Sequence, residues 1–127
     1  MEENKKRVPW AIWTVNEEEF KLKLNTSVIT KLESKYKINL LDTLSTGSIP
    51  PLGVMLDVTH GALQKFHHGI KLEKVYEMFD DYVEEGGSQI TFMSDVYLPI
   101  FTASGFFSPA QAMEMDANLQ EAKEQMI

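Results

Sequence analysis

Apolar and polar residues alternate in one region of the chain, between residues 11 and 24. Ala11, Trp13 and Val15 form one alternating run, and Phe20, Leu22 and Leu24 form the next. A period of two is typical of strands with one buried face, and the polar residues 16–19 between the runs suit a turn. The pattern predicts a β-hairpin over residues 11–24, with the rings of Trp13 and Phe20 in the core.

From residue 26 onward, apolar residues recur at three- and four-residue spacing, which is the period of a helix. Thr26 or Ser27 is expected to cap a first helix through Tyr36, and Asn39 a short one with Asp42 in its first turn. Two longer helices follow, ended by glycines. Their expected buried residues are Leu52, Met55, Leu56, Thr59, Ala62, Leu63 and Phe66 before Gly69, and Leu72, Val75, Tyr76, Phe79, Tyr82 and Val83 before Gly86 and Gly87.

Two further helices are predicted towards the C-terminus. Ser88 begins the first, and Pro99 should kink or break it because proline has no amide hydrogen to donate. Its expected inner residues are Ile90, Met93, Val96, Tyr97, Ile100 and Phe101, and Gly105 ends it. The sequence Ser108-Pro109-Ala110-Gln111 combines an N-cap serine, a proline at the first helical position and a glutamine two residues later. This combination predicts the start of the last helix.

These elements predict a mainly α fold, a small helical bundle with a short N-terminal β-hairpin. We expect residues 1–9 to be a flexible segment, residues 10–107 to form one globular domain, and residues 108–127 to form a loosely docked amphipathic helix. A chain of 127 residues with 43% hydrophobic residues can bury one core. The last helix has a narrow apolar stripe at a chain end, where helices fray unless they are docked.

Composition and charge argue against several function classes. The chain has no cysteine, so neither a disulfide nor a thiolate metal site is expected. The net charge is −7, and no basic stripe offsets it, so nucleic-acid binding is not expected. The N-terminus lacks the pattern of a secretory signal, and no apolar run approaches membrane-spanning length. We therefore expect a cytoplasmic protein without a membrane partner.

No residue set indicates catalysis, a cofactor or a metal ion. His60 and His67 share a predicted helix face, but they lack the four-residue spacing and nearby glutamate of a zinc motif; with His68, they are interpreted as surface or helix-end histidines. The acidic cluster is interpreted as a solvated helix face; its members are Asp80, Asp81, Glu84 and Glu85. Phosphate-binding, dinucleotide-binding and nucleophile motifs are absent. We do not expect an enzyme.

The remaining signals favour protein binding. Phe106 and Phe107 lie in a loop between a glycine and a proline, and methionines follow on the last helix. Methionine side chains adapt to irregular partner surfaces, and amphipathic helices dock into grooves. The candidate partner-binding residues are Phe106, Phe107, Met113, Met115, Leu119 and Met126.

Three segments between Phe20 and Phe107 have a recognisable order. The strand FKLKL leads into the helix text TKLESKY, residues 62–70 read ALQKFHHGI, and residues 75–87 read VYEMFDDYVEEGG. This order resembles the tail assembly chaperones of long-tailed bacteriophages and prophages, especially those of Gram-positive hosts. The family usually has a glycine after the first helix, where this chain has Lys37.

The resemblance implies a protein of the bacterial host cytoplasm that is not retained in the mature virion. It implies that the protein binds the tape measure protein, keeps it soluble and promotes assembly of the tail tube, with the tail tube protein as a second partner. An acidic domain with a methionine-bearing helix suits a long, apolar, helical target. Self-association remains open, as do two other functions: a head–tail connector or other phage structural subunit, and a small phage or plasmid regulatory protein.

Overall fold

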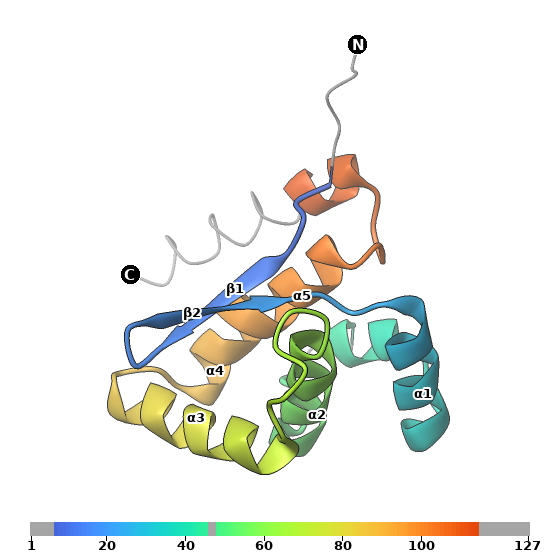
Figure 1. The fold of residues 1–127 in the computed structure, drawn as a ribbon. Helices are drawn as coiled ribbons and strands as arrows, with labels where there is room; N and C mark the ends of the chain where they lie inside the picture. The colour runs from blue at the N-terminus through green and yellow to red at the C-terminus, as the bar shows by residue number, and fades with distance from the viewer. Residues whose placement is uncertain (1–6, 46–47, 115–127) are drawn as a thin grey trace.

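The computed structural model describes residues 7–45 and 48–114. The fold is mainly α with an N-terminal β-hairpin, as the sequence predicts. In Figure 1 the hairpin lies across the helices, with α3 (Leu72–Glu84) near its turn and α1 (Thr26–Tyr36) at the far side. Helix α2 (Leu52–Leu63) lies between them. The hairpin therefore joins elements that are far apart in the sequence.

The hairpin consists of β1 (Ala11–Val15) and β2 (Glu18–Leu22), paired in antiparallel register with Trp13 opposite Phe20. Trp13 is 1% exposed, while Phe20 is partly buried against the core. The turn has two residues, Asn16 and Glu17, with φ of 55° and 63°. This left-handed pair matches the twist of the strands, and it is shorter than the predicted turn over residues 16–19.

The outer edge of β2 is covered by the end of α2 and the turn that follows it. The amide of Lys23 donates to the carbonyl of Ala62 at 2.9 Å, and the amide of Lys21 donates to Nε2 of His67 at 3.0 Å. Both bonds satisfy groups that an edge strand would otherwise expose. The hairpin is thereby attached to the helical part of the protein.

Helix α1 begins after Asn25, whose side chain accepts from the amide of Val28 at 3.1 Å. The expected cap at Thr26 or Ser27 is wrong by one or two residues, because asparagine fills that role as well as they do. The helix ends at Lys37, a left-handed residue with φ of 58°. The 3-10 helix η1 (Leu40–Leu44) follows; Asn39 precedes it but makes no side-chain capping bond.

Helix α2 is shorter than predicted, and α3 has a narrower buried face than predicted. Phe66 lies after the end of α2 and is 36% exposed, although it was expected on the buried stripe. In α3, Tyr76 and Val83 are 48% and 41% exposed, whereas Met78 is buried. The residues that α3 buries completely or nearly so, Val75, Met78 and Phe79, cover a narrow arc. The sequence pattern overestimated the width of that arc.

The helical segment after Ser88 contains a π-helical turn. It consists of α4 (Gln89–Phe92), the π turn η2 (Met93–Tyr97) and α5 (Leu98–Ala103). The amide of Leu98 donates to Met93, five residues earlier. Pro99 cannot donate a hydrogen bond to the carbonyl of Asp95, and the helix has a π turn at this point in place of the predicted kink or break. One consequence is that Phe92 is buried while Ile90, expected inside, is 65% exposed.

Candidate functional site

The C-terminal side of the fold holds the described candidates for partner binding. Helix α5 is capped at Ser104, and Gly105 follows with φ of 92°, a left-handed value that favours glycine. The chain then turns back over the helix. The ring of Phe106 lies 4.7 Å from that of Phe101, and both Phe106 and Phe107 are partly buried against the core. Both rings therefore hold the loop against the core, and neither is fully available for contact with a partner.

The N-terminal segment is tied to this loop. The guanidinium of Arg7 donates to the carbonyl of Phe107 at 2.5 Å and to that of Thr102 at 3.4 Å. Figure 1 shows this part of the chain beside the helical turn after the loop. Val8 is 59% exposed at the same place. Arg7 thus lies within the segment 1–9 that was expected to be flexible, and it makes two backbone contacts.

The last helix starts as the sequence predicts. Gln111 and Ser108 exchange hydrogen bonds in a capping box, with the amide of Ser108 donating to Oε1 at 2.9 Å and the amide of Gln111 donating to Oγ at 3.2 Å. Ala112 is 9% exposed, whereas Met113 is 68% exposed. We call Phe106, Phe107 and Met113 the C-terminal surface. Met115, Leu119 and Met126 lie outside the described residues.

Sequence reasoning missed a patch of aromatic and basic side chains. The ammonium of Lys21 lies 4.0 Å from the ring centre of Trp10 and 5.6 Å from that of Phe66. Lys65 also lies 5.6 Å from Phe66, and the rings of Trp10 and Phe66 meet edge to face at 5.6 Å. We call these four residues the aromatic–basic patch. Three separate segments supply them, so no motif in the sequence could reveal it.

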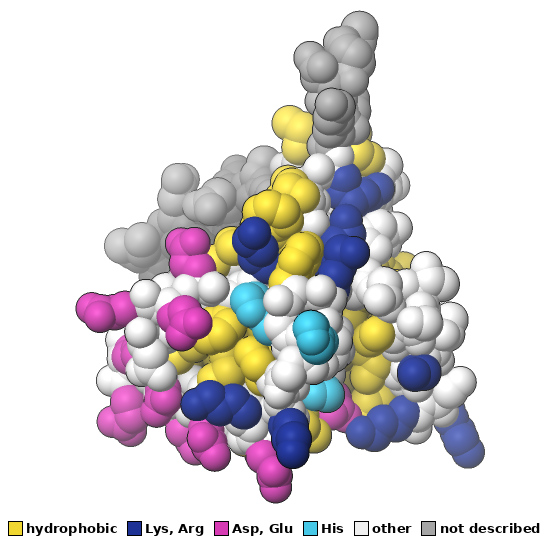
Figure 2. All heavy atoms as spheres, viewed as in Figure 1, with side chains coloured by type: hydrophobic (Ala, Val, Ile, Leu, Met, Phe, Trp, Pro, Cys, Tyr) yellow, Lys and Arg dark blue, Asp and Glu magenta, His cyan; other side chains and the backbone are white. Residues whose placement is uncertain are grey.

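Charge is segregated over the visible face of the molecule. Figure 2 shows acidic side chains gathered on the side of the hairpin turn, basic and apolar ones above and beside them, and the histidines between. The acidic cluster is not wholly a solvated face. The carboxylate of Asp81 accepts a hydrogen bond from Nδ2 of Asn16 at 2.8 Å, and that of Glu85 accepts one from the backbone amide of Asn16 at 2.9 Å. These two carboxylates hold the hairpin turn against α3.

The histidines also differ in role. His67 accepts the amide of Lys21 and packs its ring edge to face with Phe20 at 5.3 Å, so it joins strand and helix end. His68 is exposed. Within residues 7–45 and 48–114, no three histidine or carboxylate side chains gather in a group that could hold a metal ion.

An ion pair with a tyrosine links α1 to α2. Asp57 accepts from Nζ of Lys35 at 2.5 Å and from the hydroxyl of Tyr36. Burial raises the pKa of Asp57, but hydrogen bonds from Lys35 and Tyr36 outweigh it and lower the pKa below its ordinary 3.8. Burial and the bond to Asp57 raise the pKa of Tyr36. This set fixes the packing of the two helices.

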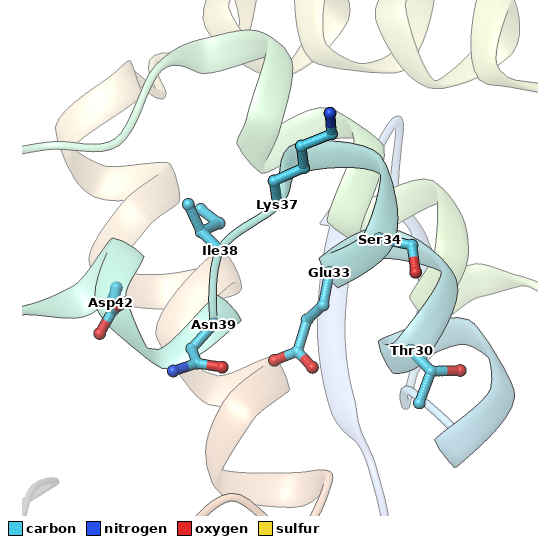
Figure 3. A pocket seen from close by; sticks show the side chains of 7 residues that line it. All are labelled: Thr30, Glu33, Ser34, Lys37, Ile38, Asn39 and Asp42. Carbon is cyan, nitrogen blue, oxygen red and sulfur yellow. The ribbon is translucent and has the colours of Figure 1, made fainter.

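A polar hollow lies between the end of α1 and η1, but its side chains do not converge on a ligand. In Figure 3, Glu33 and Asn39 face each other, while the ends of Lys37, Ser34 and Thr30 point away. Glu33 is already engaged, because its carboxylate accepts the amide of Leu40 at 2.9 Å. The hollow is therefore an open surface depression where α1 meets η1, without the features of a ligand site.

The fold and its exposed apolar surfaces define a small, mainly helical protein with an N-terminal hairpin. The chain belongs to a family of unknown function, DUF6096, whose model matches residues 9–126. Comparisons with curated proteins and with solved structures gave no match. In the part of the chain that the structure describes, no helix is long and apolar enough to cross a bilayer.

Proposed function

We propose that this protein is a tail assembly chaperone of long-tailed bacteriophages or prophages. In this role it binds the tape measure protein, keeps it soluble and promotes assembly of the tail tube, with the tail tube protein as a second partner. It acts in the cytoplasm of the bacterial host, by binding and without chemistry of its own, and it is not retained in the virion.

The conformation of Lys37 supports the resemblance on which this proposal rests. The chaperone family usually has a glycine after the first helix, and Lys37 stands there with φ of 58°. Glycine adopts that left-handed conformation without strain, whereas lysine does not. The backbone at this position is therefore the one that the family's glycine suits, although the residue differs.

The segment ALQKFHHGI also has a structural reason to recur. His67 accepts a hydrogen bond from a backbone amide of β2, and the carbonyl of Ala62 accepts one from the amide of Lys23, the residue that follows β2. A histidine in this place joins the hairpin to the end of α2. The residues that resemble the chaperone family thus hold the fold together. This is expected if the family shares a fold that presents a binding surface.

The exposure of Met113 is the observation that carries the proposal. A capping box fixes the start of the last helix, the neighbouring Ala112 faces inward, and Met113 is 68% exposed. A flexible, polarisable side chain in this place suits contact with the apolar side of a helical partner. The acidic charge of the remaining surface favours solubility of the complex.

Co-purification with a tape measure protein from the same genome tests this role. Met113→Asp should reduce the recovered tape measure protein about tenfold, because a carboxylate would be buried without a partner. Ile90→Asp is the matched control, since Ile90 is 65% exposed on another surface. Equal recovery with both variants would show that the C-terminal surface is not the binding site.

A further inference from the structure

The aromatic–basic patch carries positive charge that nothing in the described chain neutralises. The ammonium groups of Lys21 and Lys65 lie over the rings of Trp10 and Phe66, and neither has a carboxylate within ion-pair distance among residues 7–45 and 48–114. Phe66 is 36% exposed. In a protein with a net charge of −7, such a patch selects for an acidic, apolar partner.

A second surface, at the other end of α2, has the complementary character. Tyr76 is 48% exposed, and Leu56 and Phe79 provide an apolar floor. Asp80 lies at the rim, and Glu77 is exposed on the same helix, where Lys74 lies 3.9 Å from its carboxylate. We call this surface the acid-rimmed hollow; it is lined by Leu52, Gly53, Leu56, Tyr76, Phe79 and Asp80.

Gly53 lines the hollow at the first turn of α2. A methyl group added there would meet no atom within 4 Å, so no close contact requires a glycine. Glycine in a helix costs about 0.5–1 kcal/mol relative to alanine. Its effect in this place is to leave space between the first turn of α2 and the side chain of Tyr76.

We infer that the acid-rimmed hollow of one molecule binds the aromatic–basic patch of a second copy of this chain. An exposed ring of the patch enters the hollow, and Lys21 and Lys65 lie against Asp80 and Glu77. Charge complementarity selects this occupant, because the patch combines the exposed ring of Phe66 with two ammonium groups that have no ion-pair partner among the described residues. The inference does not depend on the proposed chaperone role.

The positions of the two surfaces restrict the types of assembly. Leu52 begins α2, whereas Phe66 lies just after its end at Leu63, so the two surfaces flank opposite ends of one helix. Two copies related by a twofold axis, with their α2 helices antiparallel, would make this contact twice and form a closed dimer, whereas a single contact between each pair of copies would repeat to give a ring or an open chain. In either case the mass should rise with protein concentration and fall as salt screens the charges; one step to a dimer identifies the reciprocal contact, and several steps identify the repeating one.

Sedimentation of the full chain tests the inference. The wild type should associate with increasing concentration, and the double variants Lys21→Glu with Lys65→Glu and Glu77→Lys with Asp80→Lys should each associate at least about tenfold more weakly. Mixing the two double variants should restore a complex, because the exchanged charges are again complementary. A wild type that stays monomeric, or a mixture that does not associate, would overturn the inference.

Two substitutions in the hollow provide a test that leaves the charges unchanged. Gly53→Trp should block the hollow and abolish association, whereas Gly53→Ala should leave association unchanged, since there is room for its methyl group. Met113→Asp should also associate like the wild type, which separates this contact from partner binding at the C-terminal surface. Association that survives Gly53→Trp in a folded variant would contradict the proposed contact.

Discussion

The imidazole of His67 accepts the backbone amide of Lys21, with 3.0 Å between Nε2 and the amide nitrogen. The residues are 46 positions apart, and their bond fixes the outer edge of the hairpin to the turn after α2. An acceptor at Nε2 requires a neutral ring with its hydrogen on Nδ1. His67 is thus a structural residue that closes the sheet edge.

Replacing His67 should destabilise the protein. In His67→Leu the amide of Lys21 loses its acceptor, and the expected cost is about 1–2 kcal/mol in the free energy of unfolding. His68→Leu serves as the control because His68 is exposed. Denaturant titrations that give the same midpoint for both variants would show that the bond contributes nothing.

Lys37→Gly should stabilise the protein. The left-handed φ of 58° strains lysine but suits glycine, and the relief of strain exceeds the extra entropy of glycine in the unfolded chain. We expect a gain of about 0.5 kcal/mol in thermal or denaturant unfolding. Lys37→Ala removes the same charge but keeps the strain, so it should not stabilise; a gain with alanine as large as with glycine would contradict this explanation.

Stability should depend on pH through Asp57. Its folded pKa lies below the ordinary 3.8, so the carboxylate adds stability above that value and the contribution is lost as the pH falls through the folded pKa. Asp57→Asn should be less stable than the wild type near neutral pH, by about 1 kcal/mol. The difference should shrink in acid. Unfolding curves with a constant difference down to the acid limit would refute this role.

The π turn predicts unequal costs for two neighbouring truncations. Phe92→Ala should destabilise by about 3–5 kcal/mol, because Phe92 is fully buried and its ring packs edge to face on Trp13 at 5.1 Å. Ile90→Ala should change stability by less than about 0.5 kcal/mol. A larger loss of stability for Ile90→Ala than for Phe92→Ala would contradict the π turn and support an uninterrupted α-helix with Ile90 on its buried side.

The sequence predicted the hairpin and the helices because strand and helix periods differ clearly in this chain. The prediction of buried residues failed where the helix departs from a constant number of residues per turn. Counting back from Tyr97, a π turn places the residue five positions earlier, Phe92, on the buried side, whereas an α-helix would place Met93 there. A periodic stripe carries no sign of that extra residue.

The surfaces were less predictable than the fold, for a different reason. Asn16 and Asp81, like Trp10 and Phe66, meet only through folding, and no spacing along the chain relates them. The start of the last helix was predictable because its capping box is local. Sequence reasoning therefore predicted the start of the helix that carries Met113 but missed the aromatic–basic patch.

The proposed chaperone role is tested most directly by the solubility of a tape measure protein from the same genome. Expressed alone, that protein should aggregate, because its long apolar helices lack a partner. Coexpressed with this chain, it should appear in the soluble fraction in a complex of defined mass, and Met113→Asp should reverse this effect while Ile90→Asp does not. A tape measure protein that stays insoluble beside the folded wild-type chain, or is soluble without it, would contradict the proposed function.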